Sequence, residues 1–195
     1  IHTYSNVIQS IVLRIIEILV ALDCRVHVGT ATMPTVLYKR IQKLLGGPDD
    51  VYEIKLESQT LASFNRHQIY KLTNREDAFE IIASAVKNHS KLLIVCNQVK
   101  RAQEFYEEIA ELYPEVRKML IHSRYKRNDR TRLETNLRTD FNTLENTPCI
   151  VVSTQVVEVS LDISFDVMIT ECAPIDALAQ RFGRINRKRS VENIG

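Results

Sequence analysis

The sequence lacks the closely spaced cysteines on which zinc sites and redox motifs depend. Its cysteines, Cys24, Cys96, Cys149 and Cys172, lie far apart along the chain, and three of them fall in apolar runs. Isolated cysteines in apolar runs are typical of buried free thiols. We therefore expect unpaired thiols, as in a reducing cytoplasm, and no metal site.

The sequence also lacks an apolar run long enough to cross a membrane, because Arg14 and Glu17 interrupt the longest candidate. The first residues do not show the basic region, apolar run and small-residue cleavage site of a leader peptide, in that order. We expect a soluble, cytoplasmic protein without a membrane partner.

A strong charge of one sign is missing as well. The net charge is only +2 over 195 residues, which is too small to indicate nucleic-acid binding by itself. The charge is unevenly distributed, however, because residues 117–138 are mainly basic and residues 103–115 are acidic. The length and the 45% hydrophobic content suit one large domain, or one domain with a piece of another.

The pattern of apolar residues predicts an α/β fold. From residue 75 onwards, short apolar strands alternate with amphipathic helices, which indicates a mostly parallel sheet covered on both faces. In such a sheet the functional groups gather in the loops at the carboxyl ends of the strands. The predicted helices are 5–22, 34–45, 75–88, 98–112, 127–144 and 175–182, and the predicted strands are 25–28, 51–56, 67–72, 91–96, 119–122, 149–153 and 166–170.

The first predicted helix, residues 5–22, has an apolar arc that is wider than one stripe. A helix of this kind needs burial on more than one side. We therefore expect it to pack against more than one neighbour, or to make the isolated chain a homo-oligomer. Gly46, Gly47 and Pro48 end the next helix, and we place a domain boundary after residue 46.

Three arginines and a glycine lie close together in the stretch Gln180-Arg181-Phe182-Gly183-Arg184-Ile185-Asn186-Arg187. If the helix that starts near Pro174 continues through this stretch, Arg184 and Arg187 share one face with Gln180. Two guanidinium groups on one face favour binding to a phosphate or carboxylate. The alternative is a basic helix end that only contacts solvent.

A second polar stretch, Ser153-Thr154-Gln155-Val156-Val157-Glu158-Val159-Ser160-Leu161-Asp162, follows a predicted strand. Its hydroxyl and amide groups can donate to phosphate or sugar, and its two acids can accept from arginine or from a ribose hydroxyl. A polar turn without a ligand is the alternative for this stretch taken alone.

Together, the two stretches resemble the fifth and sixth motifs in the second RecA-like domain of superfamily 2 helicases. The sixth motif is written Gln-x-x-Gly-Arg-x-x-Arg in that family, and Thr30-Ala31-Thr32 resembles its third motif, usually Ser-Ala-Thr. The residues of both stretches, together with His122-Ser123-Arg124, are most similar to the helicase part of the CRISPR-associated helicase-nuclease of type I interference systems.

This resemblance implies an ATP-dependent helicase that translocates on single-stranded DNA. ATP would lie between two RecA-like domains, with Arg184 and Arg187 reaching the γ-phosphate as arginine fingers and Gln180 helping to position it. Gly183 belongs to the same cofactor-binding motif. Asp162 would accept a hydrogen bond from the ribose or tie the fifth motif to the sixth.

The resemblance also assigns a nucleic-acid track. Thr154, Gln155, Ser123 and Arg124 would face the phosphates of the single strand, with Lys126 and Arg127 extending the basic surface. Thr30 and Thr32 would couple ATP hydrolysis to domain movement. For His122 a functional role and a packing role remain open, and Arg130 and Arg132 are expected to lie on a solvated helix face.

The same resemblance divides the chain into two parts: residues 1–46, the end of the first RecA-like domain, and residues 47–195, the second. Ile1-His2-Thr3-Tyr4 resembles the tail of an Asp-Glu-x-His box whose acids precede residue 1. The sequence has no Gly-x-x-x-x-Gly-Lys-Ser/Thr loop, so we expect that this chain alone does not hydrolyse ATP and that residues elsewhere hold the magnesium ion.

The expected partners are single-stranded DNA, the first RecA-like domain and a CRISPR surveillance complex. Two alternatives remain: a general superfamily 2 helicase domain acting on RNA or DNA, and a non-catalytic interaction module that keeps the fold.

Overall fold

The computed structural model describes residues 6–29, 33–62, 67–141, 149–158 and 163–187. The chain divides into two compact units, Ile1–Leu61 and Ala62–Gly195. The domain boundary that the sequence suggests after residue 46 lies inside the first of these units. We describe each unit by itself.

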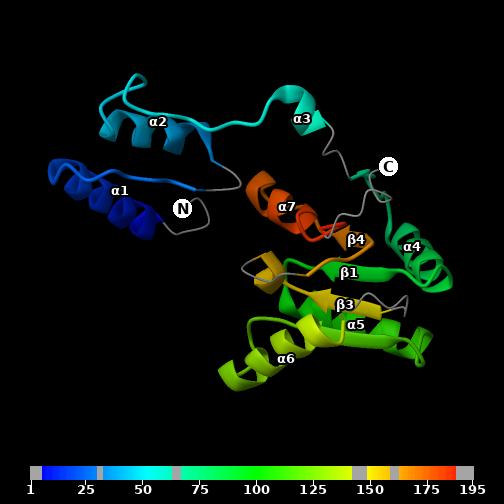
Figure 1. Cartoon of the computed structure of the whole chain (residues 1–195). Coiled ribbons are helices and arrows are strands. Elements are labelled where there is room, and N and C mark those ends of the chain that lie inside the picture. The colour runs from blue at the N-terminus through cyan, green and yellow to red at the C-terminus, as the bar shows by residue number, and fades with distance from the viewer. Residues whose placement is uncertain (1–5, 30–32, 63–66, 142–148, 159–162, 188–195) are drawn as a thin grey trace. The chain divides into compact units, whose positions relative to one another are not determined.

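The first unit contains helices α1 (Asn6–Ala21) and α2 (Thr35–Leu44), shown in Figure 1. Leu13 and Ile16 of α1 pack against Leu37 and Ile41 of α2 and form a small core. The short helix α3 (Ser58–Ala62) lies at the junction with the second unit. Helices α1 and α2 confirm the predicted helices 5–22 and 34–45.

Two strands predicted in the first unit, 25–28 and 51–56, are wrong, because the structure gives neither segment strand pairing. Val26 and Val28 instead pack against the core of α1 and α2 from a loop. Tyr52 and Ile54 are exposed. A strand needs a neighbouring strand for its main-chain groups, and the described part of this unit offers none.

The second unit is built on a sheet of parallel strands in the order β2-β3-β1-β4. The strands are β1 (Lys91–Val95), β2 (Arg117–Ile121), β3 (Cys149–Ser153) and β4 (Val167–Thr170). All residues of β3 are buried, as the apolar sequence of this strand predicts for a sheet that is covered on both faces.

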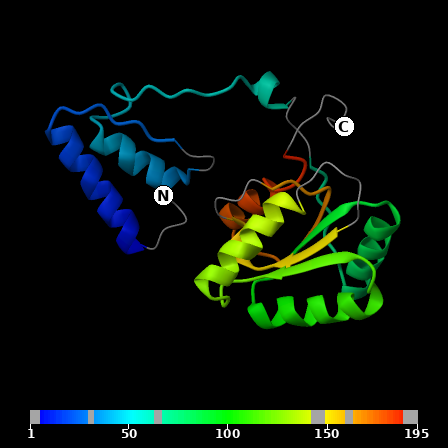
Figure 2. The ribbon, with the colours of Figure 1, turned by 60° about the horizontal axis from the view of Figure 1, so that its bottom comes forward.

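Alternate residues of the strands supply two separate cores, one on each face of the sheet. Leu92 and Ile94 pack with helices α4 (Arg75–Lys87) and α5 (Val99–Leu112). Leu93 and Val95 point to the other face, where they pack with helix α6 (Arg127–Thr139) and with the short helix η1 (Gln155–Glu158). Figure 2 shows α5 and α6 on opposite faces of the sheet. The result is the predicted three-layer α/β fold.

Most elements of the second unit confirm the prediction to within two residues, including helix α7 (Ile175–Phe182). Helix α6 is shorter than predicted, because the chain leaves the helix after Thr139 and buries Phe141 in the core. The predicted strand 67–72 is wrong, since Ile69 and Tyr70 are exposed and the segment has no strand pairing.

None of the helices in the described part of the chain is long and apolar enough for a membrane crossing.

Candidate functional site at the carboxyl edge of the sheet

The parallel strands gather the residues that follow them at one edge of the sheet, which we call the carboxyl edge. The N–H of Thr154, just after β3, donates to the carbonyl of Ile121 at 3.3 Å, and the N–H of Glu171, just after β4, donates to that of Val95 at 3.0 Å. The loops that carry the predicted motifs of the second unit therefore begin side by side, as expected for a parallel α/β sheet.

Thr154 and Gln155 lie together at this edge. Thr154 is 1% exposed, and its Oγ1 has no hydrogen-bond partner among the described residues. Gln155 is exposed, and its Nε2 donates to the main-chain oxygen of Asn97 at 3.1 Å. Because a buried hydroxyl without a partner is destabilising, Thr154 Oγ1 suits a ligand or water at this position.

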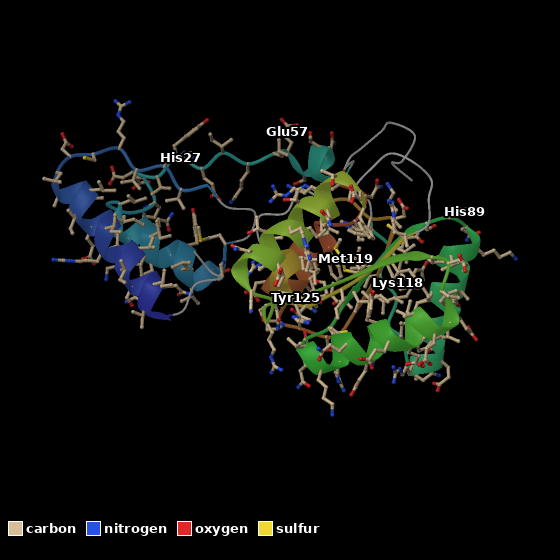
Figure 3. The ribbon with its side chains drawn as sticks, turned by 90° about the horizontal axis from the view of Figure 1, so that it is seen from below. His27, Glu57, His89, Lys118, Met119 and Tyr125 are labelled. Carbon is tan, nitrogen blue, oxygen red and sulfur yellow. The ribbon has the colours of Figure 1, made fainter. Side chains whose placement is uncertain are left out.

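The loop after β2 carries His122, which is buried and stacks on Tyr125 with 4.3 Å between the ring centroids. Figure 3 shows Lys118 and Met119 along β2 and Tyr125 beyond its carboxyl end. Burial lowers the pKa of His122, with a smaller contribution from the charge of Arg124, so the ring is neutral near pH 7. Its Nδ1 has no partner in the described part of the chain.

Basic residues at the start of α6 lie next to this loop. Ser123, Arg124 and Lys126 are exposed, whereas the side chain of Arg127 lies outside the described residues. Arg130 is partly buried and pairs with Glu134 at 2.8 Å on the same helix. Of the predicted track residues that the structure describes, Arg124 and Lys126 therefore carry exposed cations.

The side chain of Arg181 is 1% exposed, and each side of its guanidinium group donates to an acceptor at the carboxyl edge. Nε donates to Glu158 Oε1 at 2.8 Å, Nη1 to Thr170 Oγ1 at 2.8 Å, and Nη2 to Asn97 Oδ1 at 3.0 Å. Arg181 therefore serves packing and salt bridging inside the domain.

Arg184 lies in the turn after α7, because the helix ends at Phe182. Its guanidinium group is buried, and Nε and Nη2 donate to the main-chain oxygens of Val157 and Glu158, each at 2.8 Å. The prediction that Arg184 and Arg187 share a helix face with Gln180 is wrong, since neither arginine belongs to the helix. Arg184 instead holds the turn against η1.

We call residues 183–187 the arginine turn. Main-chain bonds fix it: Asn186 N–H donates to Phe165 O at 2.9 Å, and Arg187 N–H donates to Ser164 Oγ at 2.9 Å. Asn186 has φ 45°, in the left-handed region that asparagine tolerates better than most residues. The side chain of Arg187 is exposed, whereas Gln180 is partly buried on α7.

Gly183 caps the end of α7 with φ −60°, so its backbone does not demand glycine. A Cβ at this position would lie 3.3 Å from the carbonyl oxygen of Gln180, which is a tight contact. The glycine therefore leaves room for the chain to turn closely against the last helical residues.

Three predicted site residues, Thr30, Thr32 and Asp162, lie outside the described residues, so their assigned roles remain predictions. Within the described residues, no group of three or more His, Cys, Asp or Glu side chains could hold a metal ion.

Sequence reasoning missed Asn97 and Glu171 as members of the site. Asn97 follows β1, and its N–H donates to Glu171 Oε2 at 2.6 Å while its Nδ2 donates to the carbonyl of Cys172 at 2.8 Å. The available signal was their position, because each is a polar residue close to the carboxyl end of an apolar strand. That position did not reveal which side chains would bind them.

Known proteins are similar to this chain over most of its length. The family model described as "CRISPR-associated nuclease/helicase Cas3, C-terminal" matches residues 88–190, just over half of the 195 residues. The CRISPR-associated nuclease/helicase Cas3 of Streptococcus thermophilus is 26% identical over 215 residues, which cover 97% of this chain and 23% of that protein.

Two solved structures have a similar fold. The crystal structure of T. fusca Cas3-ATP has a TM-score of 0.77 and 22% identity, covering 100% of this chain and 27% of that one. A chain of a CRISPR RNA-guided surveillance complex, pre-nicking, has a TM-score of 0.70 and 21% identity, covering 100% of this chain and 28% of its own length. This chain thus spans about a quarter of the length of these relatives.

The parallel sheet, covered on both faces, defines a RecA-like α/β domain. The chain belongs to the CRISPR-associated nuclease/helicase Cas3 family and corresponds to its C-terminal part. The resemblance inferred from the motifs is therefore confirmed.

Proposed function

We propose that this chain is part of an ATP-dependent helicase that translocates on DNA and unwinds it during CRISPR interference. The observation that carries the proposal is the pair of bonds from Arg184 to the main chain of Val157 and Glu158. These bonds join the arginine turn to the segment that begins with Thr154 and Gln155. An ATP-facing turn and a DNA-facing loop are thus parts of one rigid edge.

On the ATP side, Arg187 is the residue best suited to reach the γ-phosphate. Its side chain is exposed to solvent, and its main chain is held by the bond from its N–H to Ser164 Oγ. Gln180 and Gly183 shape the same turn, and we assign Asp162 to the ribose or to the contact between motifs. ATP and its magnesium ion would be held mainly by the first RecA-like domain.

Arg184 has a different role in this proposal, because its guanidinium group already donates to two carbonyl oxygens. It positions the arginine turn in this structure, and it approaches ATP as a second finger only if those bonds exchange. Substitution of Arg184 would also disturb the arginine turn, so Arg187 is the better residue for a test of the arginine-finger role.

On the DNA side, the proposal uses Ser123, Arg124 and Lys126 after β2 and Thr154 and Gln155 after β3. These residues combine exposed cations with a buried hydroxyl that lacks a partner among the described residues. This combination suits the phosphates of a single strand. Arg127, Thr30 and Thr32 keep their predicted roles in DNA contact and coupling, and the surveillance complex and the first RecA-like domain are the proposed partners.

The test compares Arg187→Ala with wild type in the full-length protein, measuring ATP hydrolysis with and without single-stranded DNA. Arginine fingers contribute about 10³- to 10⁵-fold to the rate in related NTPases, so the variant should lose DNA-stimulated turnover. Arg138→Ala is the matched control, because Arg138 is exposed on α6, outside the arginine turn and the loops of the carboxyl edge, and should keep wild-type turnover.

Unchanged turnover in a folded Arg187→Ala protein would remove the finger assignment. A wild-type protein that binds DNA but hydrolyses no ATP would instead favour the non-catalytic module.

A further inference from the structure

Arg181 is the most enclosed charge of the carboxyl edge. Its guanidinium group, besides the bonds to Glu158, Thr170 and Asn97, donates through Nη1 to the main-chain oxygen of Glu171 at 3.1 Å. Its acceptors come from the ends of β1 and β4 and from η1. One side chain of α7 therefore holds three separate loops of the edge.

Asn97 extends this set of contacts to the DNA-facing loop. Its side-chain oxygen accepts from Arg181 at 3.0 Å, and its main-chain oxygen accepts from Gln155 Nε2 at 3.1 Å. A continuous path of hydrogen bonds thus runs from Arg181 through Asn97 to Gln155. Since the Gln155 bond uses the main chain of Asn97, this bond does not itself require an asparagine side chain.

The chemistry of a buried guanidinium group makes this path stiff. Hydrogen bonds weaken steeply as they lengthen or bend, and a buried charge that loses its acceptors is strongly destabilised. Arg181 and its acceptors are therefore expected to move together. Arg181 lies one turn before Arg184 on the segment that carries the arginine turn, so a displacement of that turn acts on Asn97.

We propose that Arg181 and Asn97 are positioning residues that transmit movements of the arginine turn to Gln155 and so couple ATP hydrolysis to contact with single-stranded DNA. The proposal rests on the function proposed above and adds to it two residues that are expected to touch neither ATP nor DNA. The bond between Arg181 Nη2 and Asn97 Oδ1 is the junction between the arginine turn and the loop that carries Gln155.

The test uses Asn97→Ala and Arg181→Lys in the full-length protein. Asn97→Ala removes the junction with Arg181, together with the bond from Nδ2 to the carbonyl of Cys172, and keeps the main-chain acceptor of Gln155. Arg181→Lys keeps the charge but cannot reach all four acceptors. The measured quantity is the ratio of ATP turnover with saturating single-stranded DNA to turnover without DNA, alongside KM for ATP. The ratio should fall by about two- to thirtyfold in each variant, the usual range for residues that carry coupling.

A residue with a merely structural role would change both turnover rates together and leave their ratio unchanged. The double variant provides a second criterion: because both changes break the same junction, it should lower the ratio no further than the more severe single variant. Arg75→Lys is the matched control, since Arg75 pairs with Glu108 between α4 and α5 and is expected to leave the ratio unchanged.

The outcomes separate this inference from the function on which it rests. A wild-type protein whose ATP hydrolysis does not respond to DNA overturns both. A responsive wild type with an unchanged ratio in folded Asn97→Ala overturns this inference alone. If Arg181→Lys does not fold, Asn97→Ala decides by itself, because this change leaves the buried pair of Arg181 and Glu158 in place.

Discussion

At the scale of single residues, the three arginines of one short motif lie in three different environments. Arg181 is buried against a carboxylate, Arg184 is buried against main-chain carbonyls, and Arg187 is exposed. Burying a guanidinium group is costly unless acceptors surround it, so the acceptors decide which arginine the fold encloses. The sequence of the motif shows the density of charge but not the acceptors, which lie at positions 97, 157, 158, 170 and 171.

The cysteines allow a prediction at the same scale. Burial raises the pKa of Cys96 to about 12 and that of Cys149 to about 11. At pH 8 almost no reactive thiolate forms at either residue in the folded protein. Cys24 and Cys172 are exposed. Iodoacetamide at pH 8, followed by peptide mapping, should therefore modify Cys24 and Cys172 but leave Cys96 and Cys149 unmodified.

The control for this experiment is the same reaction in denaturant, where all four thiols should react. Because their folded-state pKa values are raised, Cys96 and Cys149 favour the folded state below the ordinary thiol pKa, and this contribution is lost as the pH rises through their folded values. Rapid modification of Cys96 in the native protein would show that β1 is less protected than the structure indicates.

At the scale of elements, the strands that were predicted correctly are those that pair with other apolar strands in the sheet. β3 was predicted with its observed bounds, because five consecutive buried residues leave little ambiguity. The segments 25–28, 51–56 and 67–72 also carry β-forming residues, yet the structure gives them no pairing. A local pattern shows that a segment suits a strand, but pairing depends on a partner that is distant in sequence.

The end of α7 shows the same limit for helices. The helix was predicted with its observed bounds, but the possibility of continuing it through Arg187 gave the wrong geometry for the site. What stops the helix is the contact of the arginine turn with Phe165 and Ser164, which come from a segment about twenty residues earlier. Candidate residues could therefore be named from sequence, whereas their arrangement could not be predicted from it.

Helix α4 supports a quantitative prediction about element stability. Asn74 Oδ1 accepts from the N–H of Asp77 at 2.8 Å, and Asp77 Oδ2 accepts from the N–H of Asn74 at 3.3 Å, which together form a capping box. Asn74→Ala should lower the free energy of unfolding by about 1 kcal/mol, because the N–H of Asp77 loses its side-chain acceptor. Urea unfolding followed by circular dichroism measures the difference.

Two variants sharpen this measurement. Asn74→Asp keeps a capping oxygen and should cost at most a few tenths of that value, about 0.3 kcal/mol. Asn88→Ala removes an asparagine from the other end of α4, where its side chain makes only a 3.3 Å bond to Ser84, and should cost clearly less than Asn74→Ala. Equal losses at both ends would contradict the capping argument.

At the scale of the whole molecule, α1 has two apolar faces, of which the described part of the first unit covers one. Leu13 and Ile16 are buried against α2. Ile11, Ile15 and Ile18 lie within an arc of about 60° on the opposite face, at 100° per residue, and each is roughly half exposed. The wide apolar arc predicted from sequence is therefore present, and its second face has no partner in the described part of the first unit.

We predict that a polypeptide of residues 1–195 associates with itself through this second face of α1, because an exposed apolar stripe of this length favours contact with another apolar surface. Sedimentation velocity at increasing protein concentration should show a shift from monomer to dimer. The double variant Ile11→Glu with Ile15→Glu should stay monomeric, since it places charges in the middle of the stripe. Gln98→Glu with Asn128→Glu adds the same charge at exposed positions of the second unit and should associate like wild type. A wild-type chain that remains monomeric at every concentration would show that exposure of this face is not enough for association.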